Sequence, residues 1–149
     1  MKFFPILLLF SVFFTHTVTA QINPVKWTYA SKKINADEYE VTFAATIDQG
    51  WNIYSQHTDP SGPVPTSINF ENNTEVTFIG ETTETGKKKE AFDELFGVNV
   101  IKFADKVVFT QKVKTAKTNS KVVGYLEYMC CDDEKCLPPM EVEFSIPLK

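Results

Sequence analysis

The sequence lacks the pattern that builds helices. After residue 20, no segment of helical length has apolar residues recurring at positions i, i+3, i+4 and i+7. The periodic runs are instead rich in valine, isoleucine, threonine and aromatic residues, which favour strands. This absence argues against a helical fold and predicts an all-β protein.

Basic residues are also few and scattered. The 149 residues carry 15 Lys and Arg against 19 Asp and Glu, a net charge of −4 at pH 7. The one basic run, Lys87-Lys88-Lys89, is typical of a solvated loop tip. Binding to nucleic acid draws on an extended basic surface, so we expect no nucleic acid partner.

Only the N-terminus carries a long apolar run. This run extends from Phe3 to Phe14 and is followed by the small residues of Val18-Thr19-Ala20. It is too short for a membrane-spanning helix, which needs about 20 apolar residues, so it predicts a Sec signal peptide over residues 1–20, cleaved after Ala20. We therefore expect a single domain at 21–149 that is periplasmic or otherwise exported, and soluble after signal cleavage.

Short runs of strand character recur along the rest of the chain. The clearest is Tyr39–Ile47, where alternate residues are apolar and would share one face of a strand. About eight or nine short strands separated by close turns predict an antiparallel β-sandwich, of immunoglobulin type. The predicted strands are Trp27–Ile34, Tyr39–Ile47, Trp51–Ser55, Thr66–Phe70, Glu75–Ile79, Val98–Phe103, Lys106–Val113, Lys121–Tyr128 and Glu141–Ile146.

The intervening segments are mostly polar. Gln56–Pro65 is rich in Pro, Ser, Gly and Asp and predicts a long loop. Glu81–Glu90 is charged, and we expect it to be mobile. Ala91–Gly97 brings apolar residues into a loop, and Ala104-Asp105 predicts a turn between two strands.

All three cysteines lie between two predicted neighbouring strands. Either Cys130 or Cys131 could close a small ring with Cys136. In an oxidising compartment nearby thiols form disulfides, which leaves one thiol unpaired. A disulfide that only pins the hairpin of a non-catalytic binding module fits this spacing as well as an exchangeable disulfide does.

The residues between the cysteines are acidic. Asp132, Asp133 and Glu134 disfavour a thiolate, so a disulfide attacked by a partner's thiolate is favoured over a self-activated nucleophile. Adjacent cysteines in an extended backbone point to opposite sides and do not readily share a metal ion. We expect neither a metal nor a cofactor.

Two further stretches carry candidate site residues. Asp93-Glu94-Leu95-Phe96-Gly97 is either a lid over a reactive site or a loop whose apolar residues pack into the core. Gly50-Trp51-Asn52-Ile53-Tyr54 is an aromatic strand that could form the wall of a pocket or fill the core. His57, in the Pro-rich loop, is interpreted as a solvated residue.

Taken together, these stretches resemble the N-terminal periplasmic domain of DsbD, the transmembrane thiol:disulfide interchange protein. Tyr128–Pro139 is similar to the family's active-site hairpin, Asp93–Gly97 to its cap loop, and Gly50–Tyr54 to the aromatic strand beside the site. The resemblance implies an immunoglobulin-like fold. It also implies electron transfer from a thioredoxin-like domain to periplasmic partners, such as disulfide isomerases and the thioredoxins of cytochrome c maturation.

The resemblance further implies residue roles. The redox pair is Cys131 with Cys136, and Cys130 is the alternative partner of Cys136. The other implied roles are shielding of the disulfide by Leu95 and Phe96, control of thiol protonation by Asp93 and Glu94, and packing beside the site by Tyr54.

We also expect particular partners for this chain and a particular order of attack on the two cysteines of the disulfide. The sequence ends at Lys149 without a membrane domain, so we expect thioredoxin-fold partners and a separate membrane electron donor of the DsbD type. Cys131 should lie nearer the polar rim and be attacked first, because Leu137 and two prolines follow Cys136 and should shield it. Cys130 should be a buried, weakly reactive thiol on the opposite side of the strand.

Overall fold

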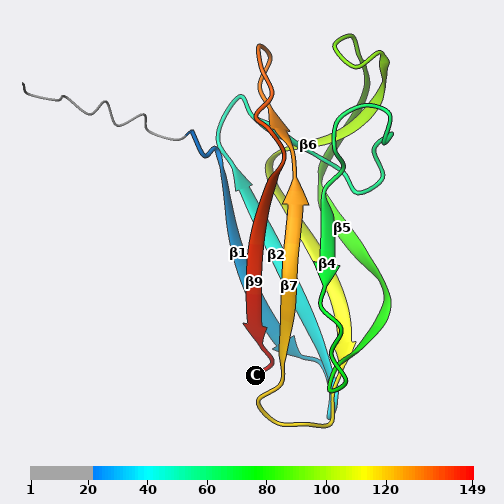
Figure 1. Cartoon of the computed structure of the whole chain (residues 1–149), viewed down its shortest axis with the longest axis vertical. Coiled ribbons are helices and arrows are strands. Elements are labelled where there is room, and N and C mark those ends of the chain that lie inside the picture. The colour runs from blue at the N-terminus through cyan, green and yellow to red at the C-terminus, as the bar shows by residue number, and fades with distance from the viewer. Residues whose placement is uncertain (1–21) are drawn as a thin grey trace, which may run out of the picture.

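The computed structural model describes residues 22–149, so the predicted signal peptide lies outside the described residues. These residues form nine β-strands and no helix (Figure 1). They therefore contain no helix of the length and apolarity that crossing a bilayer requires. The strands are β1 (Val25–Lys33), β2 (Glu38–Ile47), β3 (Asn52–Tyr54), β4 (Ser67–Phe70), β5 (Thr77–Asp93), β6 (Val98–Lys114), β7 (Lys121–Tyr128), β8 (Cys130–Cys131) and β9 (Met140–Pro147).

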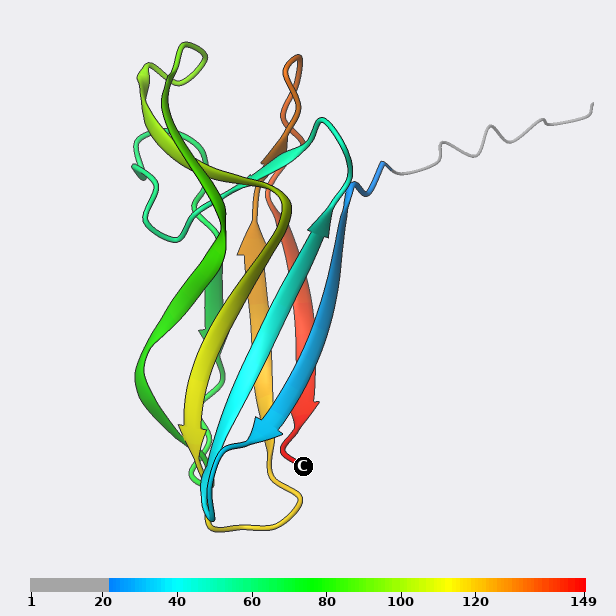
Figure 2. The same ribbon diagram turned by 180° about the vertical axis from the view of Figure 1, so that it is seen from behind.

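Two antiparallel sheets pack face to face (Figures 1 and 2). One has the strand order β1-β2-β6-β3-β8, with β5 along the other edge of β6, and the second has the order β4-β7-β9. In β2 the alternate residues Val41, Phe43, Ala45 and Ile47 are buried between the sheets, at a gain of roughly 1.5–3 kcal/mol for each large side chain. The predicted fold class, an antiparallel β-sandwich of immunoglobulin type, is confirmed.

β6 is one continuous strand of 17 residues, so the predicted turn at Ala104-Asp105 is wrong. Its residues 106–114 pair with β2, whereas Lys102 and Phe103 pair with β3. Asp105 has a φ of 63° at the point where the strand changes partner. A left-handed residue bends the strand there, and this local irregularity gives the sequence its turn-like pattern.

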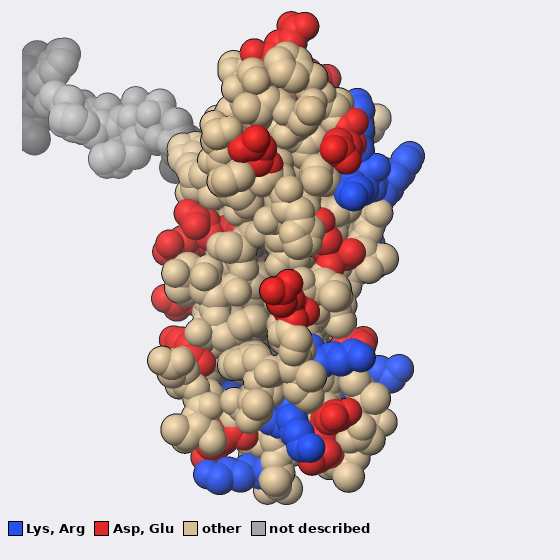
Figure 3. All heavy atoms as spheres, turned by 90° about the vertical axis from the view of Figure 1, so that its right-hand side faces the viewer, with Lys and Arg blue, Asp and Glu red and all other residues tan. Residues whose placement is uncertain are grey.

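β5 also has 17 residues, which corrects the prediction of a mobile segment at Glu81–Glu90. It lies at the edge of its sheet and pairs with β6 over most of its length. Lys87-Lys88-Lys89 are exposed as expected, but they lie within the strand and not at a loop tip. Charged residues protect an edge strand from pairing with other chains. Figure 3 views the side that carries β5 and shows charges of both signs spread over it.

The outer halves of β5 and β6, residues 87–104, form a bent hairpin that we call the arm. A register shift between Gly86 and Lys88 lies at its base, level with the bend of β6. A Cβ atom on Gly86 would lie 2.9 Å from the carbonyl oxygen of Lys106, so the strands approach too closely there for a side chain. The bend carries the arm over the end of the sandwich where the cysteine hairpin projects (Figures 1 and 2).

The predicted loop at Gln56–Pro65 contains no strand and fastens the arm. The Ser55 N–H donates to the Ile101 carbonyl at 2.9 Å. The Ile101 N–H in turn donates to Thr58 Oγ1 at 3.0 Å. Since Ser55 and Thr58 are both buried, this pair of bonds fixes the arm to the body of the domain.

Candidate redox site

The cysteine hairpin joins two neighbouring strands, as predicted, because β7 and β9 pair along their whole length. One residue after β7, Cys130 and Cys131 form β8, which pairs with β3 of the other sheet. The chain therefore crosses between sheets at the cysteines. This crossing brings Cys131 beside the buried Tyr54 of the aromatic strand.

Cys131 and Cys136 form a disulfide around a short turn. The Asp132 N–H donates to the Lys135 carbonyl at 2.9 Å. The Asp132 carboxylate accepts the N–H groups of Glu134 and Lys135 at 2.8 and 2.7 Å. These hydrogen bonds to the carboxylate hold the pKa of Asp132 below its usual range. The turn therefore has its own hydrogen-bond network in addition to the disulfide.

Cys130 is a free thiol with no exposed surface. It packs in the main core, whereas Cys131 belongs to a separate cluster with Tyr54 and Val100. Burial, and to a smaller degree the charge of Asp132, raises the pKa of Cys130 to about 11. The prediction of a buried thiol on the opposite side of the strand is confirmed.

The predicted shielding of the two disulfide cysteines is wrong. Cys131 is only 5% exposed, and Cys136 is the more exposed of the pair. Cys131 is held in β8 and covered by the cluster around Tyr54. Pro138 and Pro139 after Cys136 are exposed and turn toward solvent, so they do not cover it.

The tip of the arm, Asp93–Gly97, is a tight turn, which we call the cap turn. The Gly97 N–H donates to the Asp93 carbonyl at 2.8 Å, and the Leu95 N–H donates to Asp93 Oδ1 at 3.0 Å. Gly97 has a φ of 70°, a conformation that glycine adopts without strain. The two acidic and two apolar residues thus lie on a hydrogen-bonded tip and not in a loose loop.

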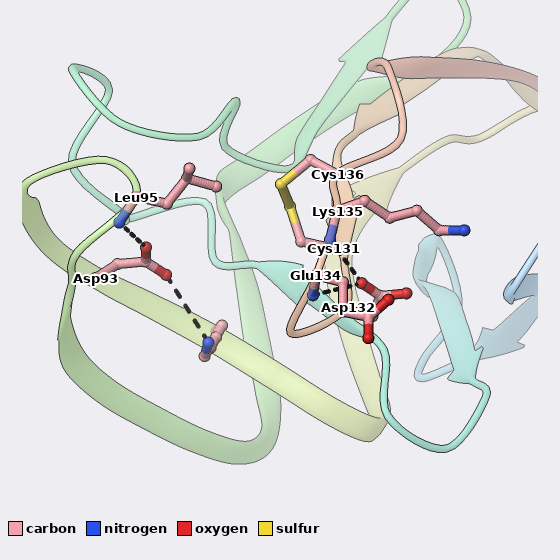
Figure 4. Close-up of a disulfide and its surroundings, with 8 residues drawn as sticks. Asp93, Leu95, Cys131, Asp132, Glu134, Lys135 and Cys136 are labelled. Atoms are coloured by element: carbon pink, nitrogen blue, oxygen red, sulfur yellow. Dashed lines mark hydrogen bonds and ion pairs between the residues drawn. A yellow bond between two sulfur atoms is a disulfide. The ribbon is translucent and has the colours of Figure 1, made fainter.

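The two apolar residues of the cap turn are placed differently. The Phe96 ring packs edge-on against Tyr54, with ring centroids 6.2 Å apart. Leu95 is 73% exposed, and its side chain points toward the disulfide (Figure 4). Phe96 therefore closes the wall of the site, and Leu95 reaches over it from the solvent side.

A cavity of about 220 Å³ lies between the cap turn and the disulfide. Its lining comprises Tyr54, Asp93, Leu95, Phe96, Lys102, Cys131, Asp132, Asp133, Glu134, Lys135 and Cys136. Of the residues singled out from the sequence, Glu94 is exposed outside this lining and Cys130 lies behind it in the core. Lys102 was not predicted, because a single lysine in an alternating strand carries no distinguishing pattern.

Besides Asp132 and Cys130, Tyr54 has a shifted pKa at this site. Burial, and then the charges of Asp93 and Cys130, raise the pKa of Tyr54 to about 12, so Tyr54 keeps its proton at neutral pH.

Within residues 22–149, no three His, Cys, Asp or Glu side chains gather in a way that could hold a metal ion. Larger hollows of about 460 and 550 Å³ elsewhere on the surface contain no thiol.

The solved structures that resemble this chain include DsbD N-terminal domains. A structure of the Neisseria meningitidis DsbD N-terminal domain in its reduced form shares 21% identity, with a TM-score of 0.51; the match covers 80% of this chain and 83% of that one. A structure of the complex between the DsbD and PilB N-terminal domains of the same organism matches at 19% identity and a TM-score of 0.50, over 81% and 80% of the two chains.

A third structure, the N-terminal periplasmic domain of ScsB from Proteus mirabilis, matches at 15% identity and a TM-score of 0.53. The match covers 83% of this chain but only 44% of that one. At these identities the likeness shows the fold alone. No curated protein sequence matches.

The family comparison extends over almost the whole described chain. Residues 19–147 match the family described as "Thiol:disulfide interchange protein DsbD, N-terminal". This match agrees with the cysteine hairpin, the cap turn and the aromatic strand, which meet at one pocket. The chain therefore belongs to the family of DsbD N-terminal domains, which take part in thiol-disulfide interchange.

Proposed function

We propose that this chain is an exported thiol-disulfide exchange domain that passes electrons between protein partners through Cys131 and Cys136. The observation that carries the proposal is the position of the disulfide. It lies in a small pocket beneath a cap turn, at the end of the sandwich, and not between the two sheets. Such a site can be covered in the free protein and opened to a partner.

The exchange begins with attack by a partner's thiolate on Sγ of Cys136, the more exposed cysteine of the pair. The Cys131–Cys136 bond breaks, and Cys131 leaves with the electron pair as a thiolate that then takes up a proton. The partner's second thiolate attacks the partner's own sulfur in the mixed disulfide and releases Cys136. Two electrons and two protons thus pass to this chain, and the partner's dithiol becomes a disulfide.

The cap turn regulates access in this proposal. Leu95 and Phe96 shield the disulfide from small reductants, and the Tyr54 ring packs against the Phe96 ring and holds it in place. Asp93 and Glu94 add negative charge, which keeps the reduced thiols protonated until a partner displaces the turn. Asp93 has the larger influence because it lines the pocket, whereas Glu94 points into solvent.

The proposed partners are thioredoxin-fold proteins, including those of cytochrome c maturation and disulfide isomerisation, and a membrane electron donor of the DsbD type. A Neisseria meningitidis DsbD N-terminal domain has been solved in complex with the PilB N-terminal domain, which supports a protein partner for this fold. A signal peptide at residues 1–20, cleaved after Ala20, would deliver the domain to an oxidising compartment.

A purely structural disulfide is the alternative, within a non-catalytic binding module. The hydrogen bonds around Asp132 argue against it, because they already hold the turn that the disulfide encloses. A pinning bond would add little to this turn. The alternative also gives no role to the cap turn.

Trapping of a mixed disulfide tests the proposal. In a Cys130→Ala background, Cys131→Ser and Cys136→Ser variants are each mixed with a thioredoxin that lacks its resolving cysteine, in a glutathione redox buffer. Cys131→Ser should accumulate the mixed disulfide through Cys136, several-fold more than Cys136→Ser does through the buried Cys131. If neither variant forms a mixed disulfide, the exchange function is wrong. If Cys136→Ser forms more, the order of attack is reversed.

A further inference from the structure

Lys102 occupies a position in the pocket where the strand pattern calls for an apolar residue. Val98, Val100 and Lys102 alternate along β6 and so share one face of it. Val98 and Val100 pack in the cluster that contains Cys131, and Lys102 lines the pocket with both disulfide cysteines. It also lies directly opposite Tyr54 in the pairing of β3 with β6. The strand therefore directs a charged side chain at the redox site.

Its side chain is only 20% exposed, so most of the side chain is covered by neighbouring residues. Its Nζ lies 4.0 Å from Asp93 Oδ2, while Asp93 Oδ1 accepts the Leu95 N–H (Figure 4). At 4.0 Å the ion pair is loose, and a lysine side chain rotates freely enough to approach another anion. Lys102 is thus held near the disulfide without being locked to the cap turn.

Negative groups predominate around this lysine. Of the two lysines in the lining, Lys135 is exposed and its amine points away from the disulfide (Figure 4). The titratable and charged groups that line the pocket are Tyr54 from β3, Asp93 from β5, Lys102 from β6, and Asp132, Asp133, Glu134 and Lys135 from the cysteine turn. Two further groups lie outside the lining. Cys130 lies behind the pocket in the core, and Lys89 of β5 pairs with Lys102. A thiolate formed in this pocket would therefore lie among several carboxylates, with Lys102 as the one largely covered lysine of the lining.

We propose that Lys102 supplies the positive charge that stabilises the thiolate formed when the disulfide opens. The inference rests on the proposed exchange function and deepens it. Cys131 leaves with the electron pair of the broken S–S bond, and the nearby ammonium group lowers the free energy of that anion by charge attraction. Lys102 neither forms a bond nor transfers a proton. It offsets the carboxylates of the cap turn and of the cysteine turn.

The rate of alkylation as a function of pH tests this role on protein reduced with a phosphine, so no exchange partner is involved. All variants carry Cys130→Ala, which leaves only the redox thiols to react with iodoacetamide. Lys102→Met should move the midpoint of the rate profile upward by on the order of one pH unit, and Lys102→Gln should do the same. Lys102→Arg should keep the midpoint of the background protein. Thermal unfolding checks that each variant is folded.

Two further variants separate the alternatives. Lys88→Met removes the same charge from the arm, but Lys88 pairs with Phe103, the neighbour of Lys102 on the opposite face, so the midpoint should stay unchanged. Asp93→Asn should lower the midpoint, because it removes a negative charge and leaves Lys102 in place. If Lys102 acted only by holding the cap turn through Asp93, Lys102→Met and Asp93→Asn would shift the midpoint in the same direction.

Coincident profiles for Lys102→Met and the background protein would overturn the inference, as would equal shifts from Lys102→Met and Lys88→Met. These readouts are independent of mixed-disulfide trapping. Failure of the trapping experiment would remove the exchange function and with it this role. Normal trapping combined with an unshifted profile would remove the role of Lys102 alone.

Discussion

At the scale of single residues, two adjacent cysteines have different chemical states because they lie on opposite faces of one strand. Cys130 and Cys131 are neighbours in β8, yet the strand directs one into the main core and the other toward the pocket. Cys131 forms the disulfide, and Cys130 remains a buried thiol whose pKa is raised to about 11. Reactivity at this site therefore depends on which face of the strand a sulfur occupies.

Cys130 should resist alkylation in the folded, oxidised protein. At pH 9 its thiol should be half ionised in the unfolded chain, where the ordinary value is 9.0, but ionised to only about one part in a hundred in the folded state. Iodoacetamide labelling followed by mass spectrometry, with and without urea, measures the difference. Equal labelling rates in the two states at pH 9 would show that the thiol is accessible and ordinary.

The same shift predicts the pH dependence of stability. A thiol with a raised pKa in the folded state favours folding below its unfolded pKa. That contribution is lost as the pH rises through about 11. The stability of the natural sequence should therefore fall more steeply between pH 9 and 11 than that of Cys130→Ala, by up to roughly 2 kcal/mol. Urea unfolding at a series of pH values provides the comparison.

At the scale of elements, the arm carries the cap turn to the disulfide. It exists because β5 and β6 are long and bend together, with Gly86 on one strand and Asp105 on the other. The loop after β3 then fastens the arm through Ser55 and Thr58. The position of the cap turn therefore depends on residues far from it in the sequence.

Phe96→Ala should speed reduction of the disulfide by dithiothreitol several-fold, because the Phe96 ring closes the wall of the pocket against Tyr54. Leu95→Ala should have a smaller effect and change stability by less than about 0.5 kcal/mol, since Leu95 is largely exposed. The matched control is Phe92→Ala. Phe92 lies on the same arm at 63% exposure and is absent from the pocket lining. Identical reduction rates for Phe96→Ala and Phe92→Ala would mean that the cap turn does not shield the bond.

Gly86→Ala should displace the arm. Its Cβ atom would lie 2.9 Å from the Lys106 carbonyl oxygen and 3.0 Å from the Phe103 ring. Relieving these contacts should cost about 1–3 kcal/mol and should also raise the rate of disulfide reduction, because the cap turn moves with the arm. Thermal unfolding and reduction kinetics are compared with those of Thr85→Ala, an exposed neighbour. A loss of stability with no change in reduction rate would show that the position of the arm does not control access to the disulfide.

At the scale of the whole molecule, the two sheets and most strands could be predicted, because strands with one buried face leave a period-two pattern, as in β2. The polar outer half of β5 could not be predicted as a strand. An edge strand on an arm has little apolar surface to bury, so its sequence resembles that of a mobile loop. Most residues that line the pocket with the disulfide could be predicted from the order of their motifs along the chain. Lys102, and the greater exposure of Cys136, depend on strand pairing and crossing, which local sequence does not encode.

The reduction potential of the Cys131–Cys136 bond tests the proposed exchange function most directly. The domain is equilibrated with glutathione or dithiothreitol buffers of known potential, and the fraction of reduced protein is measured by quantitative alkylation. A bond that exchanges electrons with protein partners should have a potential above roughly −300 mV. A potential clearly below that value would identify a structural disulfide and contradict the proposed function.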